Sequence, residues 1–318
     1  MNKSSALRVM HEASNTLFGD SFWRNPQIKL RMIYWINGLS NYPLLLPLTQ
    51  STPPDSATAL QQADPEHLGV LMWPLVDARW KATKRLEMMA SHHHETRSIG
   101  AGLTLAIDEV KTLVQFADDL SSLSIRLERQ GFFRREGQLA LSLFHGEDRI
   151  YSLAFLISQA DGKRVAYIGA IQGVKQSEDS SLYKTITKDA HGLRPRDFTI
   201  STILVFCKAI GVNSVYAVRD ENRQHRHSYF GREGKAEVFA NYDVVWEEHE
   251  GKISPDGYFG LPVGIRIKDP ASIPAKKRSM YKRRYALLED LQCAIRDAIA
   301  KNAAVRLDGV PVVQTPQA

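Results

Sequence analysis

The residues best suited to chemistry cluster in the segment 188–196, which reads Lys-Asp-Ala-His-Gly-Leu-Arg-Pro-Arg directly before an apolar helical pattern. The free amides in the first turn of a helix bind anions, and arginine offers phosphate a bidentate donor. We therefore expect a phosphate-bearing ligand here, and the alternative is a capped helix with solvated basic residues. The expected phosphate contacts are Lys184, Lys188, Gly192, Arg194 and Arg196.

A second group of residues has the types that acyl transfer requires. Transfer to an amine or a hydroxyl needs a base for the nucleophile and a hydrogen-bond donor for the developing oxyanion. His191 and Glu248 are the candidate bases, and Gln172 and Asn222 are candidate orienting donors. For His191, the alternative is a turn histidine that hydrogen-bonds within its own loop.

Residues 242–248 add a polar and aromatic box that we expect to form a strand. Alternation along a strand places Trp246 on one face and Asp243 on the other. Trp246 then belongs to the core or to a pocket wall, while Asp243 pairs with a loop arginine. Such a pair could be purely structural. Together with Arg219, these residues are our candidates for a substrate or structural pocket.

Other motifs are weak or missing. Residues 92–95 read His-His-His-Glu, but consecutive helical residues point about 100° apart, and no His-Glu-x-x-His spacing is present, so we expect no metal site. The lack of a Gly-x-Ser-x-Gly elbow and of a Walker loop argues against a serine hydrolase and a nucleotide triphosphatase. The 2 cysteines cannot build a disulfide framework, which favours a reducing compartment.

Residues 276–284 contain six basic side chains in nine positions before a C-terminal helix. Anionic lipid headgroups or an acidic substrate suit this charge, and so does a simple solvated helix start. Nucleic acid ranks lower because no base-reading motif accompanies the run. The six cations are Lys276, Lys277, Arg278, Lys282, Arg283 and Arg284.

Strands and helices must position these groups. An apolar helix is predicted over residues 195–210 between a buried strand at 164–171 and a strand at 214–219. Short turns favour an antiparallel meander of three strands, of which 164–171 is the last. The further predicted elements are strands at 137–144, 149–158 and 258–267 and helices at 79–89, 103–127 and 283–301.

The pattern divides the chain into a helical region at residues 1–130, an α/β region at 131–307 and a disordered tail at 308–318. The 318 residues are 43% apolar, enough for a substantial core. The net charge of +6 is compatible with anionic ligands without requiring them. No secretory signal and no membrane-spanning stretch is recognisable, so we expect a cytoplasmic protein.

Four ordered boxes, at residues 169–173, 191–195, 242–248 and 256–262, together resemble the VirK/YbjX family of bacterial proteins. The resemblance extends from about Phe22 to Ile295. It implies a link to virulence and envelope stress, including tolerance of antimicrobial peptides. A peripheral contact with the inner membrane through the run from Lys276 to Arg284 agrees with such a role.

The order of strands, glycine loop, amphipathic helix and strand is also similar to the core of the N-acetyltransferase superfamily. In that core, a loop and helix N-terminus after the fourth strand hold the pyrophosphate of acyl-CoA. The superfamily loop has two closely spaced glycines, whereas this loop has one. The resemblance implies an α+β enzyme that uses acyl-CoA to acylate an envelope-related or peptide substrate. The alternative function is a non-enzymatic envelope-stress adaptor that binds anionic lipid or a protein.

Overall fold

The structure is a computed structural model. It describes residues 3–19, 27–49, 65–100, 103–173, 180–231, 241–301 and 305–307. The tail predicted at residues 308–318 lies outside the described residues. Within those ranges, no helix is both long enough and apolar enough to cross a membrane.

A mixed sheet forms the centre of the protein and confirms the α+β class. Across the described residues it has nine strands in the order β7-β8-β6-β5-β4-β3-β2-β1-β9. The strands are β1 Val110–Phe116, β2 Leu123–Glu128, β3 Leu139–His145, β4 Asp148–Ala160, β5 Lys163–Gly173, β6 Ser214–Ala217, β7 Lys252–Ile253, β8 Phe259–Leu261 and β9 Val305–Leu307.

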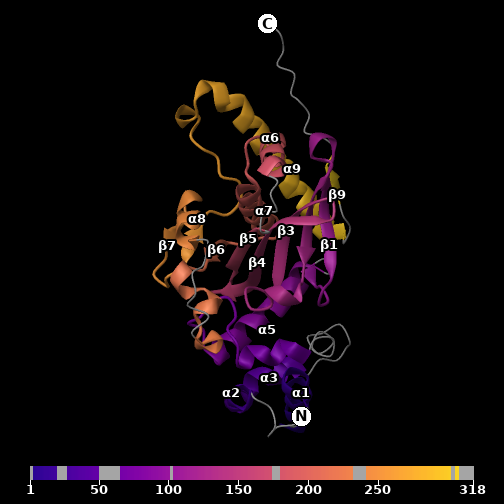
Figure 1. Cartoon of the computed structure of the whole chain (residues 1–318), viewed down its shortest axis with the longest axis vertical. Helices are drawn as coiled ribbons and strands as arrows, with labels where there is room; N and C mark the ends of the chain where they lie inside the picture. The colour runs from indigo at the N-terminus through magenta and orange to yellow at the C-terminus, as the bar shows by residue number, and fades with distance from the viewer. Residues whose placement is uncertain are drawn as a thin grey trace.

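Helices pack against both faces of this sheet. On one face, α7 (Pro195–Ala209) and α9 (Arg278–Lys301) share an apolar core with the strands. On the other face, α5 (Ala82–Ile99) packs against β4. Figure 1 shows α5 between the sheet and the N-terminal helices, with α6 and α9 at the opposite end of the molecule. The N-terminal helices are α1 Lys3–Phe18, α2 Ile28–Ser40 and α3 Tyr42–Thr49.

The predicted meander and the predicted crossover are both confirmed. Strands β3, β4 and β5 pair antiparallel in sequence order, and β6 then pairs parallel to β5. The connection between β5 and β6 contains α7, which packs on β3 and β4. This arrangement brings the N-terminus of α7 to the edge where β5 and β6 end.

Strands β5 and β6 separate after a short paired segment. Their register ends at Ile168 opposite Ala217, while β5 continues to Gly173. Gly169 is an extra residue in the pairing of β5 with β4, a bulge of the kind that often lies beside functional sites. A Cβ atom at Gly169 would lie 1.9 Å from the carbonyl oxygen of Glu136, so only glycine allows this close approach. We call the region where β5 and β6 no longer pair the β5–β6 splay.

The helix predicted at residues 103–127 is wrong. These residues form β1 and β2, joined by a short 3-10 turn at Asp118–Leu120. Asp108 has a φ of 59°, a left-handed conformation that cannot continue a helix. Pairing with β3 supplies the backbone hydrogen bonds, so the tertiary context outweighs a helix-like apolar spacing.

The strand predicted at residues 242–248 is also wrong, because this segment is helix α8 (Tyr242–Glu248). The Asn241 side chain accepts hydrogen bonds from the amides of Asp243 and Val244, at 3.0 and 3.5 Å, and caps the helix. The buried residues are Tyr242, Val245 and Trp246, which follows helical periodicity. The strand predicted at 258–267 is correct only over β8.

Candidate functional site

A wide hollow lies at the N-terminus of α7, with a volume of about 770 Å³. Helix α6 (Ser180–Asp189) and the start of α9 complete its walls. It brings together five residues expected from the sequence to be functional. They are Lys184, Lys188, His191, Gly192 and Arg194. We call this space the α7 hollow.

The loop before α7 leaves the helix amides uncapped. Arg194 occupies the N-cap position, where a serine or aspartate would normally accept hydrogen bonds from the first turn, and no side chain does so here. His191 and Gly192 have φ values of 52° and 80°. This turn is held by Arg284, whose guanidinium donates two hydrogen bonds, of 3.1 and 3.0 Å, to the His191 carbonyl oxygen. Pro195 has no N–H, so the uncapped first-turn amides are those of Arg196 and Asp197, which line the cavity next to the α7 hollow.

His191 lies in a cationic setting. Burial, together with Arg283 and Arg284, lowers the pKa of its imidazole. Neutral imidazole can accept a proton. The guanidinium groups beside it disfavour the charged product, and Asp119 and Asp189 partly oppose this effect.

Arg196 and Glu248 lie outside the α7 hollow, on a neighbouring cavity of about 280 Å³. The two residues form an ion pair, and Arg196 also contacts Asp197 at 3.1 Å. His249 approaches the same aspartate at 3.7 Å. Arg196 contacts one oxygen of the Glu248 carboxylate, and the Glu248 side chain is half exposed.

Gln172 belongs to a polar cluster around a carboxylate that the sequence analysis missed. Its side-chain amide donates a 3.0 Å hydrogen bond to Oε1 of Glu136, and the Gln224 amide donates to the same oxygen at 3.4 Å. Burial raises the pKa of Glu136 to about 7, although Gln224 and Arg223 oppose the shift. We call these three residues, Glu136, Gln172 and Gln224, the Glu136 cluster. No motif marks Glu136; its only signal is a carboxylate beside a glycine.

Side chains from α8 close the β5–β6 splay. The Tyr242 hydroxyl accepts a hydrogen bond from the Ile171 amide and donates one to the Ile171 carbonyl oxygen, both at 2.9 Å. The Trp246 indole donates to the carbonyl oxygen of Val218 at 3.0 Å. Burial raises the pKa of Tyr242 to about 12, so its hydroxyl remains a neutral donor. Trp246 is fully buried and is a core residue, one of the two roles expected for it.

The loop after β6 positions the remaining candidates. Arg219 lies 3.5 Å from an Asp243 carboxylate oxygen, and the other oxygen accepts a 2.7 Å hydrogen bond from the Asp220 amide. This pair therefore ties the loop to α8. Asn222 is buried, and its Nδ2 has no hydrogen-bond partner among the described residues. An unpaired buried donor costs stability, which is why such groups often mark functional positions.

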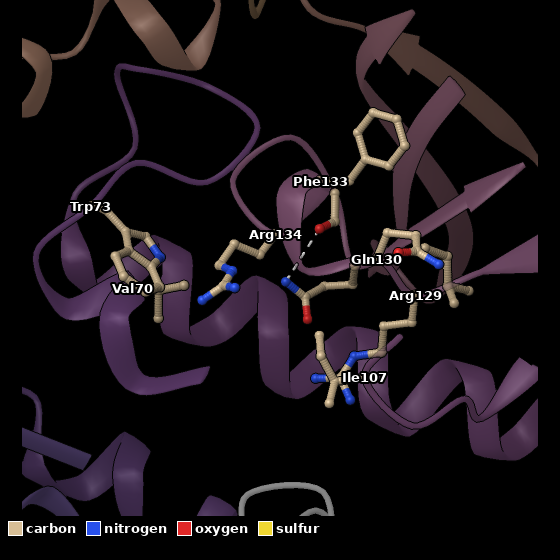
Figure 2. Close-up of a pocket in the computed structure, with 10 residues that line it drawn as sticks. Val70, Trp73, Ile107, Arg129, Gln130, Phe133 and Arg134 are labelled. Atoms are coloured by element: carbon tan, nitrogen blue, oxygen red, sulfur yellow. Dashed lines mark hydrogen bonds between the residues drawn. The ribbon is translucent and has the colours of Figure 1, made fainter. Parts of the chain in front are cut away.

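Figure 2 shows a smaller pocket, in which the side chains of Trp73 and Arg134 lie close together. The Arg134 guanidinium is 5.9 Å from the Trp73 ring. The enclosed space is about 20 Å³, room for a single water molecule. We assign no substrate to it.

Comparison with known proteins identifies the family. The family described as "Protein of unknown function (DUF535)" matches residues 24–297, so the chain belongs to it. "Uncharacterized protein YbjX" of Escherichia coli K12 is 27% identical over 277 residues, which cover 82% of this chain and 76% of the relative. The predicted resemblance to the VirK/YbjX family is thereby confirmed.

Two proteins of Haemophilus influenzae, both described as uncharacterized, are also similar. One is 28% identical over 164 residues, which cover 52% of this chain and 53% of the relative. The other is 25% identical over 224 residues, which cover 69% of this chain and 73% of the relative. None of these descriptions states an activity, so the function has to be argued from the site.

Proposed function

We propose that the protein transfers an acyl group from acyl-CoA to an amine or a hydroxyl. The observation that carries this proposal is the β5–β6 splay, which ends at the uncapped N-terminus of α7. An extended chain can pair with the backbone of a splayed strand once the side chains that occupy it leave, and a helix N-terminus binds phosphate. The thioester arm of acyl-CoA is an extended chain that could pair with the strand backbone, and its pyrophosphate is an anion that the helix N-terminus could bind.

The strand order supports the proposal by analogy. In β2 to β8, four antiparallel strands are followed by a parallel strand, and β8 then pairs antiparallel with that strand. The N-acetyltransferase core has a similar order, with a splayed fifth strand after the helix. Because one fold serves many functions, the chemistry has to rest on the side chains described above.

The residues suit the donor under one condition. Lys184, Lys188 and Arg194 face the α7 hollow and can neutralise phosphate oxygens. The backbone of Ile171 can pair with the amides of the donor arm only if the Tyr242 hydroxyl leaves. We therefore propose that the tyrosine occupies the splay in the free protein and gives way when the donor binds.

Replacing Arg194 by alanine is expected to weaken acyl-CoA binding by about 1.5–3 kcal/mol, or roughly 10- to 150-fold, because a charge-assisted phosphate contact is lost. Isothermal titration with acetyl-CoA and longer acyl-CoAs measures the change. The matched control is Lys29→Gln, an exposed cation on α2 at the other end of the molecule (Figure 1). Failure of the wild type to bind any acyl-CoA would reject the proposed function.

A further inference from the structure

We propose that Glu136 is the general base of the transfer and that the acceptor binds against the Glu136 cluster, on the face of the sheet opposite α7. This inference rests on the proposed acyl transfer. Ile171 contributes to the core shared with α7, and alternation along β5 directs Gln172 to the other face. Ala170 likewise packs on that face with Phe133. Donor phosphates and acceptor would then approach the β5–β6 splay from opposite sides.

The two oxygens of Glu136 are used differently. Oε1 accepts both amide hydrogen bonds of the cluster, whereas Oε2 accepts none from the described residues. Oε2 is therefore not a fully buried atom without a partner. The Glu136 side chain is partly exposed. The carboxylate is thus oriented by Gln172 and Gln224, while one oxygen remains free to take a proton.

The position and acidity of this carboxylate suit a base. The Glu136 backbone carbonyl contacts Gly169 at the bulge. The Glu136 carboxylate also helps to raise the pKa of Tyr242, whose hydroxyl hydrogen-bonds to the Ile171 backbone. A general base works best when its pKa is near the operating pH, and burial brings that of Glu136 to about 7. His191 lines the α7 hollow and Glu248 the neighbouring cavity, whereas Glu136 lines neither.

Arg135, whose charge acts on Glu136, defines the class of acceptor. The Arg135 guanidinium lies among aromatic rings, 5.1 Å from those of Trp73 and Tyr229 and 5.4 Å from that of Phe230. Its Nη2 donates a 3.4 Å hydrogen bond to the Tyr229 hydroxyl, its buried Nε lacks a partner among the described residues, and no carboxylate there forms an ion pair with it. The acceptor is therefore an amine or hydroxyl compound that carries a carboxylate or phosphate for Arg135. A polycationic peptide does not meet this requirement.

The chemical step balances without a further reactant. The acceptor nitrogen or oxygen attacks the thioester carbonyl carbon while its proton passes to Oε2 of Glu136. The carbon–sulfur bond then breaks, and its electron pair leaves with sulfur. The thiolate takes the proton from Glu136 through water, which regenerates the carboxylate and releases the free thiol of CoA.

Thiol release from acetyl-CoA and palmitoyl-CoA, followed with a chromogenic thiol reagent, tests the assignment. The acceptor probes are glycerate against glycerol and glycine against methylamine, so that each pair differs in the anionic group. We expect faster release with glycerate and glycine. Glu136→Gln should lower the rate by about 10²- to 10⁴-fold, as for loss of a general base, and leave acyl-CoA affinity unchanged. Glu289→Gln, an exposed carboxylate on α9, is the matched control.

The pH profile separates a base from a structural residue. With glycerate, the wild-type rate should rise up to about pH 7, where Glu136 becomes ionised, and then level off. Glu136→Gln should lose this limb, and Glu136→Asp should restore part of it. Normal donor binding with equal rates in wild type and Glu136→Gln, or with no release above background for any probe, overturns the assignment alone. Absence of acyl-CoA binding overturns the acyl transfer itself and the assignment with it.

Discussion

Replacing Tyr242 by alanine is expected to lower the free energy of unfolding by about 3–5 kcal/mol, the range for truncating a large buried aromatic side chain. Tyr242 is 0% exposed, and its hydroxyl holds both backbone groups of Ile171 in the β5–β6 splay. Truncation therefore leaves a cavity together with an unpaired amide and carbonyl. Urea unfolding followed by circular dichroism measures the loss.

Tyr242→Phe provides the matched control, because it keeps the ring and removes only the two hydrogen bonds. Its expected cost is about 1–3 kcal/mol, the penalty for leaving buried polar groups unpaired. If the donor arm replaces the hydroxyl on Ile171, Tyr242→Phe should also bind acyl-CoA more tightly than the wild type. Equal stability of Tyr242→Phe and wild type would contradict the assigned role of the hydroxyl.

Replacing Glu95 by alanine is expected to destabilise the protein by about 3–5 kcal/mol, because it removes the only carboxylate that pairs with the mostly buried Arg164 guanidinium among the described residues. The Glu95 carboxylate is 1% exposed and accepts a 2.7 Å hydrogen bond from Arg164 Nε. The same guanidinium donates to the Ile210 carbonyl oxygen at 2.7 Å. This pair links α5, β5 and the end of α7. Thermal and urea denaturation both report the change.

A double-mutant cycle with Arg164→Met provides the control for Glu95. If the pair acts as a unit, the double variant Glu95→Ala/Arg164→Met should lose less stability than the sum of the two single variants. Additive losses would show that the two side chains contribute independently. Glu95 is paired with Arg164 in the structure. The neighbouring His92 accepts a 3.0 Å hydrogen bond from the Ile157 amide.

The local pattern predicted the part of the fold that positions the α7 hollow. The turns in the β3–β4–β5 meander, and Pro195 at the start of α7, are strong local signals, and the structure agrees with both. The strand prediction for residues 242–248 was wrong because apolar and polar residues alternate over a segment too short to distinguish a strand from a helix. The Asn241 cap was the missed signal.

The chemistry of the site was harder to predict than its elements. Lys184, Lys188 and Arg194 converge because they border one loop, so their proximity in sequence carries over into space. Glu136 lies 36 residues before Gln172, and the two meet beside the bulge at Gly169, where the Glu136 backbone approaches closely. No spacing rule relates such residues, and the shift in the Glu136 pKa arises from burial that exists only in the folded chain.

The most direct test of the proposed function is a crystal structure of the protein with a thioether analogue of acyl-CoA. The account predicts that the arm of the analogue lies between β5 and β6 with its amides on the Ile171 backbone, and that the Tyr242 side chain has moved away. Its phosphates should contact Arg194 and the first-turn amides of α7. An analogue bound elsewhere at saturating concentration, with Tyr242 still on Ile171, would contradict the account.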